Sequence, residues 1–145
     1  MRINEVLSAK PSQDVVIVSP DATVRELLAL LAQHNVGALI VSSDGNKVEG
    51  IVSERDVVRS LHDDESVLDS PISSIMTTDV RTCSGSDNVN HLMKVMTEFR
   101  IRHVPVVEDD SLRGIISIGD VVKSRMSELE FERDQLDSYV HSAQS

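Results

Sequence analysis

Two short stretches of the chain carry the same pair of residues that could hold a ligand. Ser53 precedes Asp56 by three positions, and Ser117 precedes Asp120 by the same spacing, each pair between an apolar run and a helical pattern. Free N–H groups at a helix start attract anions, the carboxylate can accept both hydroxyls of a ribose, and the serine hydroxyl can donate to a phosphate. The same spacing also makes a capping box, in which the two side chains only complete the hydrogen bonding of the helix end. The pattern fits both a ligand site and a plain helix cap.

Other reactive side chains form no pattern typical of a catalytic or metal site. The single cysteine, Cys83, lies in an apolar run and is predicted to be a small core residue. No two histidines stand four residues apart with an acidic ligand, and no Ser-His-Asp or Cys-His arrangement has supporting context; the histidines are His34, His62, His91, His103 and His141. We therefore expect neither a metal site nor enzymatic activity.

The two Ser-x-x-Asp pairs belong to a longer internal repeat. The stretch GIVSERDVVRS, residues 50–60, matches GIISIGDVVKS, residues 114–124, at an offset of 64, and upstream positions match at an offset of 65. The segment around Leu7 also resembles the segment around Met76. Each copy has about 60 residues, too few to bury a core well alone, so we expect the copies to pack together.

Hydrophobic spacing predicts the order β-α-β-β-α in each copy and hence a fold of the α+β class. In the first copy the expected elements are a strand over 15–18, a helix from 24 with a capping box at 23–26, strands over 38–41 and 48–52, and a helix from near 56. In the second copy they are a strand over 80–83, a helix from 89, strands over 104–107 and 112–116, and a helix from 119 to about 141. Pro105 inside a strand predicts an edge position or irregular pairing.

The predicted boundaries follow from this repeat. We expect a first repeat over residues 1–62, a connector over 63–71, a second repeat over 72–125 and a C-terminal helical extension over 126–145. The acidic stretch from 62 to 71, which ends at a proline, is interpreted as a surface connector.

Composition excludes several classes of function. The formal net charge is −10, which argues against binding of duplex nucleic acid or an anionic membrane, because both need a basic face. No apolar run approaches the length of a membrane span, and the N-terminus lacks the apolar core of a signal peptide. With a single cysteine no internal disulfide is possible, so we expect a cytoplasmic protein.

Taken together, the order and duplication of these motifs resemble a stand-alone pair of CBS domains, the cystathionine-β-synthase-type repeat, also called a Bateman module. The resemblance covers about residues 1–125 and rests on the repeated G-I-x-S-x-x-D, the strand RHVPVV at 102–107, and the segments around Leu7 and Met76. It implies two CBS repeats packed as a pseudo-two-fold module. It also implies two clefts between the copies that bind AMP, ADP or ATP and, in some members, NAD or S-adenosylmethionine, with no required cofactor.

The resemblance also assigns ligand contacts to positions of this chain. It implies ribose hydroxyls at Asp56 and Asp120, ribose or phosphate at Ser53 and Ser117, the adenine edge at the backbone near Asp14, Val15, Thr78, Asp79 and Val80, and phosphates at Arg102 and His103.

The two clefts are not expected to be equivalent, because the copies differ in their basic residues. Where the second copy has Arg102 and His103, the first has Gly37 and Ala38, and Arg55 is replaced by Gly119. We expect the Asp120 cleft to be the stronger nucleotide site, since Arg102 and His103 belong to its own copy. The Asp56 cleft would then rely on Arg55, Arg59 or Lys10. In the alternative interpretation, Arg100, Arg102 and Arg113 are solvated surface charges.

The C-terminal segment carries a heptad-like apolar stripe interrupted by Arg133: Val122, Met126, Leu129, Leu136 and Val140. This stripe could pack back on the same protomer or form a seam with a second chain, and we expect a homodimer. The function predicted from the resemblance is a regulatory module that senses an adenine nucleotide and acts in trans on a protein effector. The alternative is a structural or interaction dimer of the same fold that binds no ligand.

Overall fold

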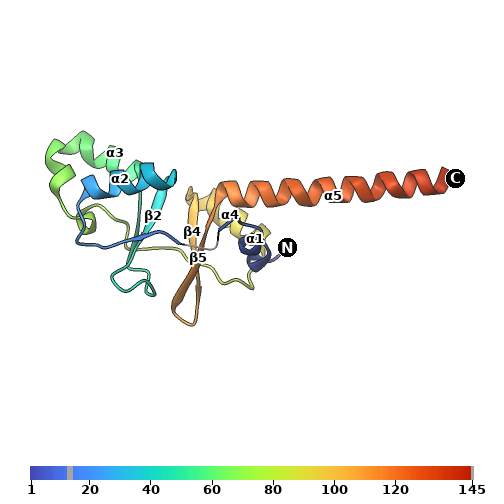
Figure 1. The fold of residues 1–145 in the computed structure, drawn as a ribbon, viewed down its shortest axis with the longest axis horizontal. Coiled ribbons are helices and arrows are strands. Elements are labelled where there is room, and N and C mark those ends of the chain that lie inside the picture. The colour runs from blue at the N-terminus through green and yellow to red at the C-terminus, as the bar shows by residue number, and fades with distance from the viewer. Residues whose placement is uncertain (13–14, 145) are drawn as a thin grey trace.

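The computed structural model describes residues 1–12 and 15–144, which form two small sheets flanked by helices and one long helix that leaves the body of the molecule (Figure 1). In chain order the elements are α1 (Ile3–Ser8), β1 (Ile17–Val18), α2 (Val24–His34), β2 (Ala38–Val41), β3 (Gly50–Ser53), α3 (Glu54–Asp63), the 3-10 helices η1 (Glu65–Asp69) and η2 (Ile72–Ser74), α4 (Val89–Phe99), β4 (His103–Glu108), β5 (Ser111–Ser117) and α5 (Ile118–Gln144). The predicted α+β class, with two repeats and a long C-terminal helix, is confirmed.

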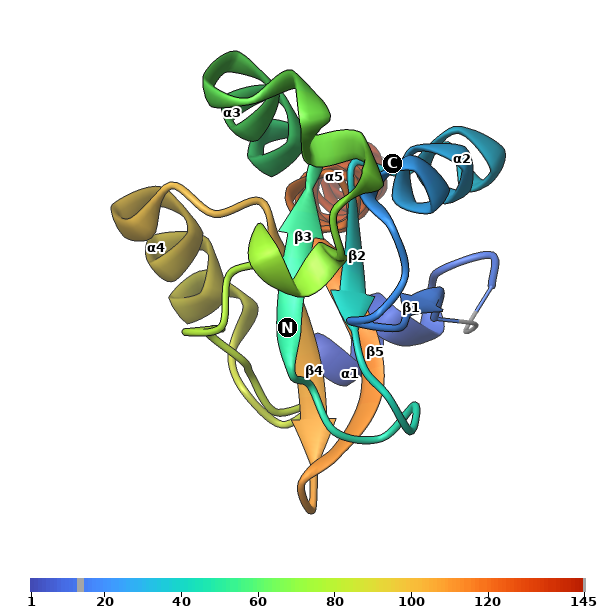
Figure 2. The ribbon, with the colours of Figure 1, turned by 90° about the vertical axis from the view of Figure 1, so that its left-hand side faces the viewer.

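Each repeat contributes one sheet. In the first, β1 runs parallel to β2, which pairs antiparallel with β3, and in the second, β4 pairs antiparallel with β5 (Figure 2). The helices start where their sequences offer caps. Thr23 and Glu26 form the predicted capping box at the start of α2. The helices α2 and α4 end at Asn35 and Arg100, which both adopt the left-handed conformation, with φ of 52° and 54°.

The buried side chains form two cores that do not coincide with the sequence repeats. One core joins α2, α3 and the first sheet and also takes in Val67 and Ile72. The other joins α4, the start of α5 and the second sheet, and it takes in Ile3 and Val6 from α1. The N-terminal helix therefore packs with the second repeat, while the segment that resembles it, around Met76, packs with the first. Figure 1 shows α1 beside β5 and α4.

Each repeat thus lends one segment to the core of the other: the N-terminal helix α1 and the segment around Met76 are the two crossing segments. Two glycines at matching positions make this exchange possible. A Cβ atom on Gly114 would lie 2.9 Å from Leu7 Cδ2, and one on Gly50 would lie 2.8 Å from Met76 Sδ. Contacts this short leave no room for a side chain, so each crossing segment packs directly on the backbone of a strand. The two copies are thereby interlocked, which explains how each repeat of about 60 residues completes its core with a segment of the other.

The strand predicted over 80–83 is wrong, and the strand predicted over 15–18 is shortened to β1. In the second copy only Cys83 bridges to β4: its N–H donates to Pro105 O at 3.0 Å, and its O accepts from Val107 N–H at 2.8 Å. Pro105 stands where the first copy has Ile40, which pairs with Ile17 of β1. Because proline has no N–H to donate, the third strand cannot extend past that bridge. The register also shifts between residues 106 and 107, as the proline predicted.

Residues 62–71 are more than the surface connector expected from their charge. They hold the helix η1, whose Val67 is buried in the first core, and Leu68 packs against that core. The interpretation failed because charge dominates the composition of this stretch, while its two adjacent apolar residues supply the packing.

The last helix is longer than predicted, from Ile118 to Gln144, and its distal part extends away from both cores (Figure 1). The stripe residues Val122, Met126, Leu129, Leu136 and Val140 are between 48% and 66% exposed. The expectation that the tail could pack back on its own protomer is therefore wrong. No helix among the described residues 1–12 and 15–144 is long and apolar enough to cross a membrane. The cytoplasmic location stays a prediction.

Candidate functional site

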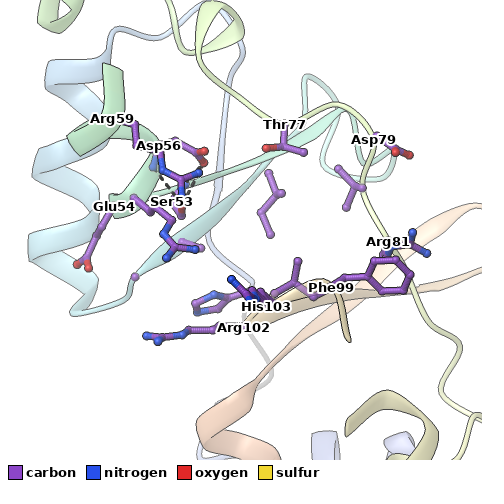
Figure 3. Close-up of a pocket in the computed structure, with 17 residues that line it drawn as sticks. Ser53, Glu54, Asp56, Arg59, Thr77, Asp79, Arg81, Phe99, Arg102 and His103 are labelled. Carbon is purple, nitrogen blue, oxygen red and sulfur yellow. Dashed lines mark hydrogen bonds between the residues drawn. The ribbon is translucent and has the colours of Figure 1, made fainter. Parts of the chain in front are cut away.

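A pocket of about 650 Å³ lies where the start of α3 faces the start of β4, a volume within the range of small-molecule sites (Figure 3). It is lined from both repeats, and its walls are residues 37–38, 51, 53–56 and 59 of the first repeat and residues 77, 79–81 and 99–103 of the second. The pocket therefore depends on the packing of the two copies against each other.

Ser53 and Asp56 sit at the N-terminus of α3, on the wall of this pocket. The Ser53 N–H and hydroxyl donate to Asp56 Oδ2 at 2.8 and 3.0 Å, and the Asp56 N–H donates to Ser53 Oγ at 3.4 Å. This is a complete capping box, so the pair does act as a helix cap. All bonds to the carboxylate engage Oδ2, so the cap does not use its second oxygen. The same side chain can cap the helix and accept a ligand hydroxyl.

Arginine side chains dominate the charge of the pocket. Five of the ten arginines in the chain line it, against three carboxylates, although the whole chain carries a net charge of −10. The arginines are Arg55, Arg59, Arg81, Arg100 and Arg102, and the acids are Glu54, Asp56 and Asp79. A concave site with this surplus of positive charge attracts an anion, and guanidinium groups suit phosphate oxygens well.

Arg81 and Phe99 are pocket residues that were not identified from the sequence. The guanidinium carbon of Arg81 lies 3.3 Å from the centroid of the Phe99 ring, and both residues line the pocket (Figure 3). Stacking on the ring holds a long side chain in place at the pocket wall. The sequence did hold a signal for them: the matching positions of the first copy are Val16 and His34. Residues that differ between the two copies are not needed for the shared fold, so they are candidates for a role in a site.

The structure corrects the assignment of Arg102 and His103. Both line the pocket that also holds Asp56, which belongs to the other repeat. Of the positions expected at the adenine edge, Asp79 and Val80 also line this pocket, and Thr78 lies between them and Thr77. The basic residues expected beside Asp120 thus lie in the pocket of Asp56, while the relative nucleotide affinity of the two clefts stays a prediction.

His103 lies on the border between this pocket and the surroundings of Asp120. It pairs in register with Ser117 across the β4–β5 hairpin, while a Cβ on Gly37 would meet its Cε1 at 3.7 Å. Burial lowers the pKa of His103, and Lys10 and Arg102 lower it further against the opposing effect of Asp120 and Glu54. The imidazole is therefore held in its neutral form near neutral pH.

Asp120 and Ser117 form the second cap, at the start of α5. The Ser117 N–H donates to Asp120 Oδ2 at 2.9 Å, and the Asp120 N–H donates to Ser117 Oγ at 3.1 Å. Here Lys10 also binds the carboxylate, with Nζ 3.1 Å from Oδ2. Burial raises the pKa of Asp120, but the Ser117 hydrogen bond and the Lys10 ion pair outweigh it, so the pKa lies below its ordinary value. Lys10 therefore belongs to the Asp120 side, and its expected role beside Asp56 is wrong.

Val15, Asp14 and Cys83 are further residues named from the sequence. Val15 does not line the pocket of Asp56, and Asp14 lies outside the described residues. Burial raises the pKa of the Cys83 thiol to about 12, in keeping with the predicted core role. Among residues 1–12 and 15–144 no group of three His, Cys, Asp or Glu side chains could hold a metal ion.

Comparison with known proteins agrees with this architecture. The family model described as "CBS domain" matches residues 3–63 and 72–127. The chain is 36% identical over 125 residues, 83% of its length, to the CBS domain-containing protein CBSX3, mitochondrial, of Arabidopsis thaliana, and spans 61% of that relative. The crystal structure of the CBS-domain containing protein ATU1752 from Agrobacterium tumefaciens is 40% identical, with a TM-score of 0.82, over 86% of this chain and 99% of that one.

A more distant match is the crystal structure of the CBS domain pair of protein MJ0100 in complex with 5-methylthioadenosine and S-adenosyl-L-methionine. It is 24% identical, with a TM-score of 0.75, over 85% of this chain and 98% of that one, which is a likeness of fold. Two interlocked repeats, each with a Ser-x-x-Asp cap at a helix start, and two family matches in tandem lead to one conclusion: the chain belongs to the CBS-domain family and carries two CBS domains.

Proposed function

We propose that the chain is a regulatory module that senses a phosphate-bearing adenine nucleotide in the pocket of Asp56 and acts in trans on a protein effector. The observation that carries the proposal is a helix N-terminus with a free carboxylate oxygen facing several arginines across one pocket. Ribose hydroxyls would bind Asp56, and phosphates would bind the arginine side and the N–H groups at the start of α3.

The charge of the pocket favours AMP, ADP or ATP over the other adenosyl ligands considered. S-adenosylmethionine carries a sulfonium cation, which five arginines would repel, while each phosphate adds favourable contacts. The ligands bound by MJ0100 support an adenosyl group as the common part, and the arginines of this chain support a different, anionic tail. NAD, with two phosphates and a second nucleoside, is the least compact of the candidates.

Signal output requires that the nucleotide bind one arrangement of the two repeats better than another. The pocket is lined from both repeats, so a ligand there contacts both and can change their relative orientation. We propose that this change passes to a partner protein.

A homodimer is part of this proposal. The apolar stripe on α5 lies half-exposed along a helix that projects from the body, and a second copy would cover it. The alternative function, a dimer that binds no ligand, has one supporting observation: the capping boxes of α3 and α5 are complete without a ligand.

A thermal-unfolding screen with AMP, ADP, ATP, NAD and S-adenosylmethionine separates the two functions. At 100 times its Kd a ligand adds about 2.7 kcal/mol to the free energy of unfolding. We expect the largest shift with a phosphate-bearing nucleotide and its loss in Arg102→Ala. Arg113→Ala, which removes an exposed arginine outside the pocket, is the matched control and should keep the shift. No shift with any of the five ligands would favour the dimer that binds none.

A further inference from the structure

The carboxylate of Asp120 is already bound by a side chain of its own molecule. Lys10 Nζ lies 3.1 Å from Asp120 Oδ2 and donates to Ile115 O at 2.9 Å, and the side chains of both charged residues are only about a quarter exposed (25% and 24%). The ammonium thus bridges the helix start of α5 and the strand that leads into it.

In the other cleft, beside Asp56, the position that matches Lys10 is occupied by an acidic residue. The crossing segment around Leu7 corresponds to the one around Met76, and three residues further on these segments have Lys10 and Asp79. Asp79 lines the open pocket and, as an anion, cannot pair with Asp56.

The backbone contacts of the two sides differ in the same way. Ile51 O accepts the N–H of Thr77 at 2.9 Å, whereas the matching carbonyl, that of Ile115, accepts the Lys10 ammonium. Lys10 therefore binds both the Asp120 carboxylate and the Ile115 carbonyl. Among the described residues no lysine takes this place beside Asp56 and Ile51, where a backbone N–H binds the carbonyl instead.

We propose that Lys10 closes the second cleft by binding the Asp120 carboxylate that a ribose would otherwise use, so that each chain has one open nucleotide site, at Asp56. The inference rests on the proposed function, because it describes the second site of the same module. The ammonium and the Ser117 cap both engage Oδ2 of Asp120, so the carboxylate is already neutralised. A ribose at Asp120 would compete with the ammonium for this anion, which weakens binding there. Removing the charge of Lys10 opens the second site.

Calorimetric titration with ATP, repeated with AMP, tests the inference by stoichiometry. The wild type should bind one nucleotide per chain, and Lys10→Met, which keeps the aliphatic stem, should bind two. Lys10→Arg retains the cation and Lys94→Met removes an exposed lysine of α4, so both should bind one. The additional site should disappear in the double variant Lys10→Met/Asp120→Ala, and Lys10→Gln serves if Lys10→Met does not fold.

A ligand-free measurement tests the pair itself. Carboxyl carbon NMR should show a higher pKa for Asp120 in Lys10→Met than in the wild type, and an unchanged value would overturn the inference. Two sites in the wild type, one of them lost in Asp120→Ala, would also overturn it, as would an equal number of sites in the wild type and in Lys10→Met. If the wild type binds nothing and Lys10→Met binds one nucleotide through Asp120, the proposed function at Asp56 fails while the role of Lys10 stands. If neither protein binds nucleotide, both fail.

Discussion

Leu7 of the N-terminal helix lies against Gly114 of β5, so close that a Cβ at position 114 would come within 2.9 Å of the leucine Cδ2 atom. This contact joins the beginning of the first repeat to the core of the second. In the same way, the contact of Met76 with Gly50 joins the beginning of the second repeat to the core of the first. Because the two repeats are interlocked in this way, the pocket between them is held by both cores.

The first prediction concerns these glycines. Gly114→Ala should lower the free energy of unfolding by about 1–3 kcal/mol, because the added methyl overpacks a buried contact with Leu7. Gly119→Ala is the control, since its Cβ would meet nothing closer than Ser117 Oγ at 3.6 Å, and alanine suits a helix better than glycine. Urea unfolding of the two variants measures the difference. Equal stability of the two variants would mean that the Leu7 contact is not tight in solution.

The second prediction concerns the thiol. Burial raises the pKa of Cys83 to about 12, so at mildly alkaline pH almost all of it stays protonated. Its reaction with a disulfide reagent should be slower than that of a free thiol by about a thousandfold, because the thiolate is the reacting form. Unfolding in urea should restore the ordinary rate. Rapid reaction of the folded protein would contradict the buried position.

The third prediction concerns pH and the Lys10–Asp120 pair. The folded pKa of Asp120 lies below its ordinary value of 3.8, so the pair contributes stability above that pH and loses it as the pH falls through the folded value. Lys10→Met should therefore be less stable than the wild type by about 1 kcal/mol near neutral pH, and the difference should shrink on acidification to about pH 3. Urea unfolding at the two pH values measures it. A difference that grows in acid has the wrong sign for this pair.

The fourth prediction concerns the long helix. A chain that ends at Ser124 lacks most of the α5 stripe and should lose the dimer, measured as mass by light scattering over a dilution series. In the full chain, Leu129→Lys with Leu136→Lys should act alike, because both place charges in an apolar seam. Ser138→Lys, on the opposite side of the helix from the stripe, is the control and should leave the mass unchanged. A truncated chain with the full dimer mass would place the interface elsewhere.

Much of the fold could be predicted from the sequence, because the helices and hairpins follow hydrophobic spacing and the repeat confirms each one by its copy. The failures have identifiable physical causes. The strand over 80–83 is cut short by the missing N–H of Pro105, which lies in a different segment. The segment 62–71 has many charged residues and few apolar ones, which predicts a surface connector, although its buried Val67 packs into the core.

The candidate site was predicted in its parts but not in its assembly. The Ser-x-x-Asp pairs and Arg102 were identified by comparing the two copies. Which cleft each residue joins depends on how the two repeats pack against each other, and periodicity within one copy carries no information about that packing. The pairing of Lys10 with Asp120 and the stacking of Arg81 on Phe99 are likewise tertiary contacts between residues far apart in the chain.

A crystal structure of the chain grown with ATP or AMP would show directly which of the two clefts holds the nucleotide. We expect a nucleotide in the pocket between α3 and β4, with its ribose hydroxyls on Asp56, its phosphates among the arginines of the pocket, and Lys10 still on Asp120. A nucleotide bound at Asp120, with the Asp56 pocket empty, would contradict this expectation.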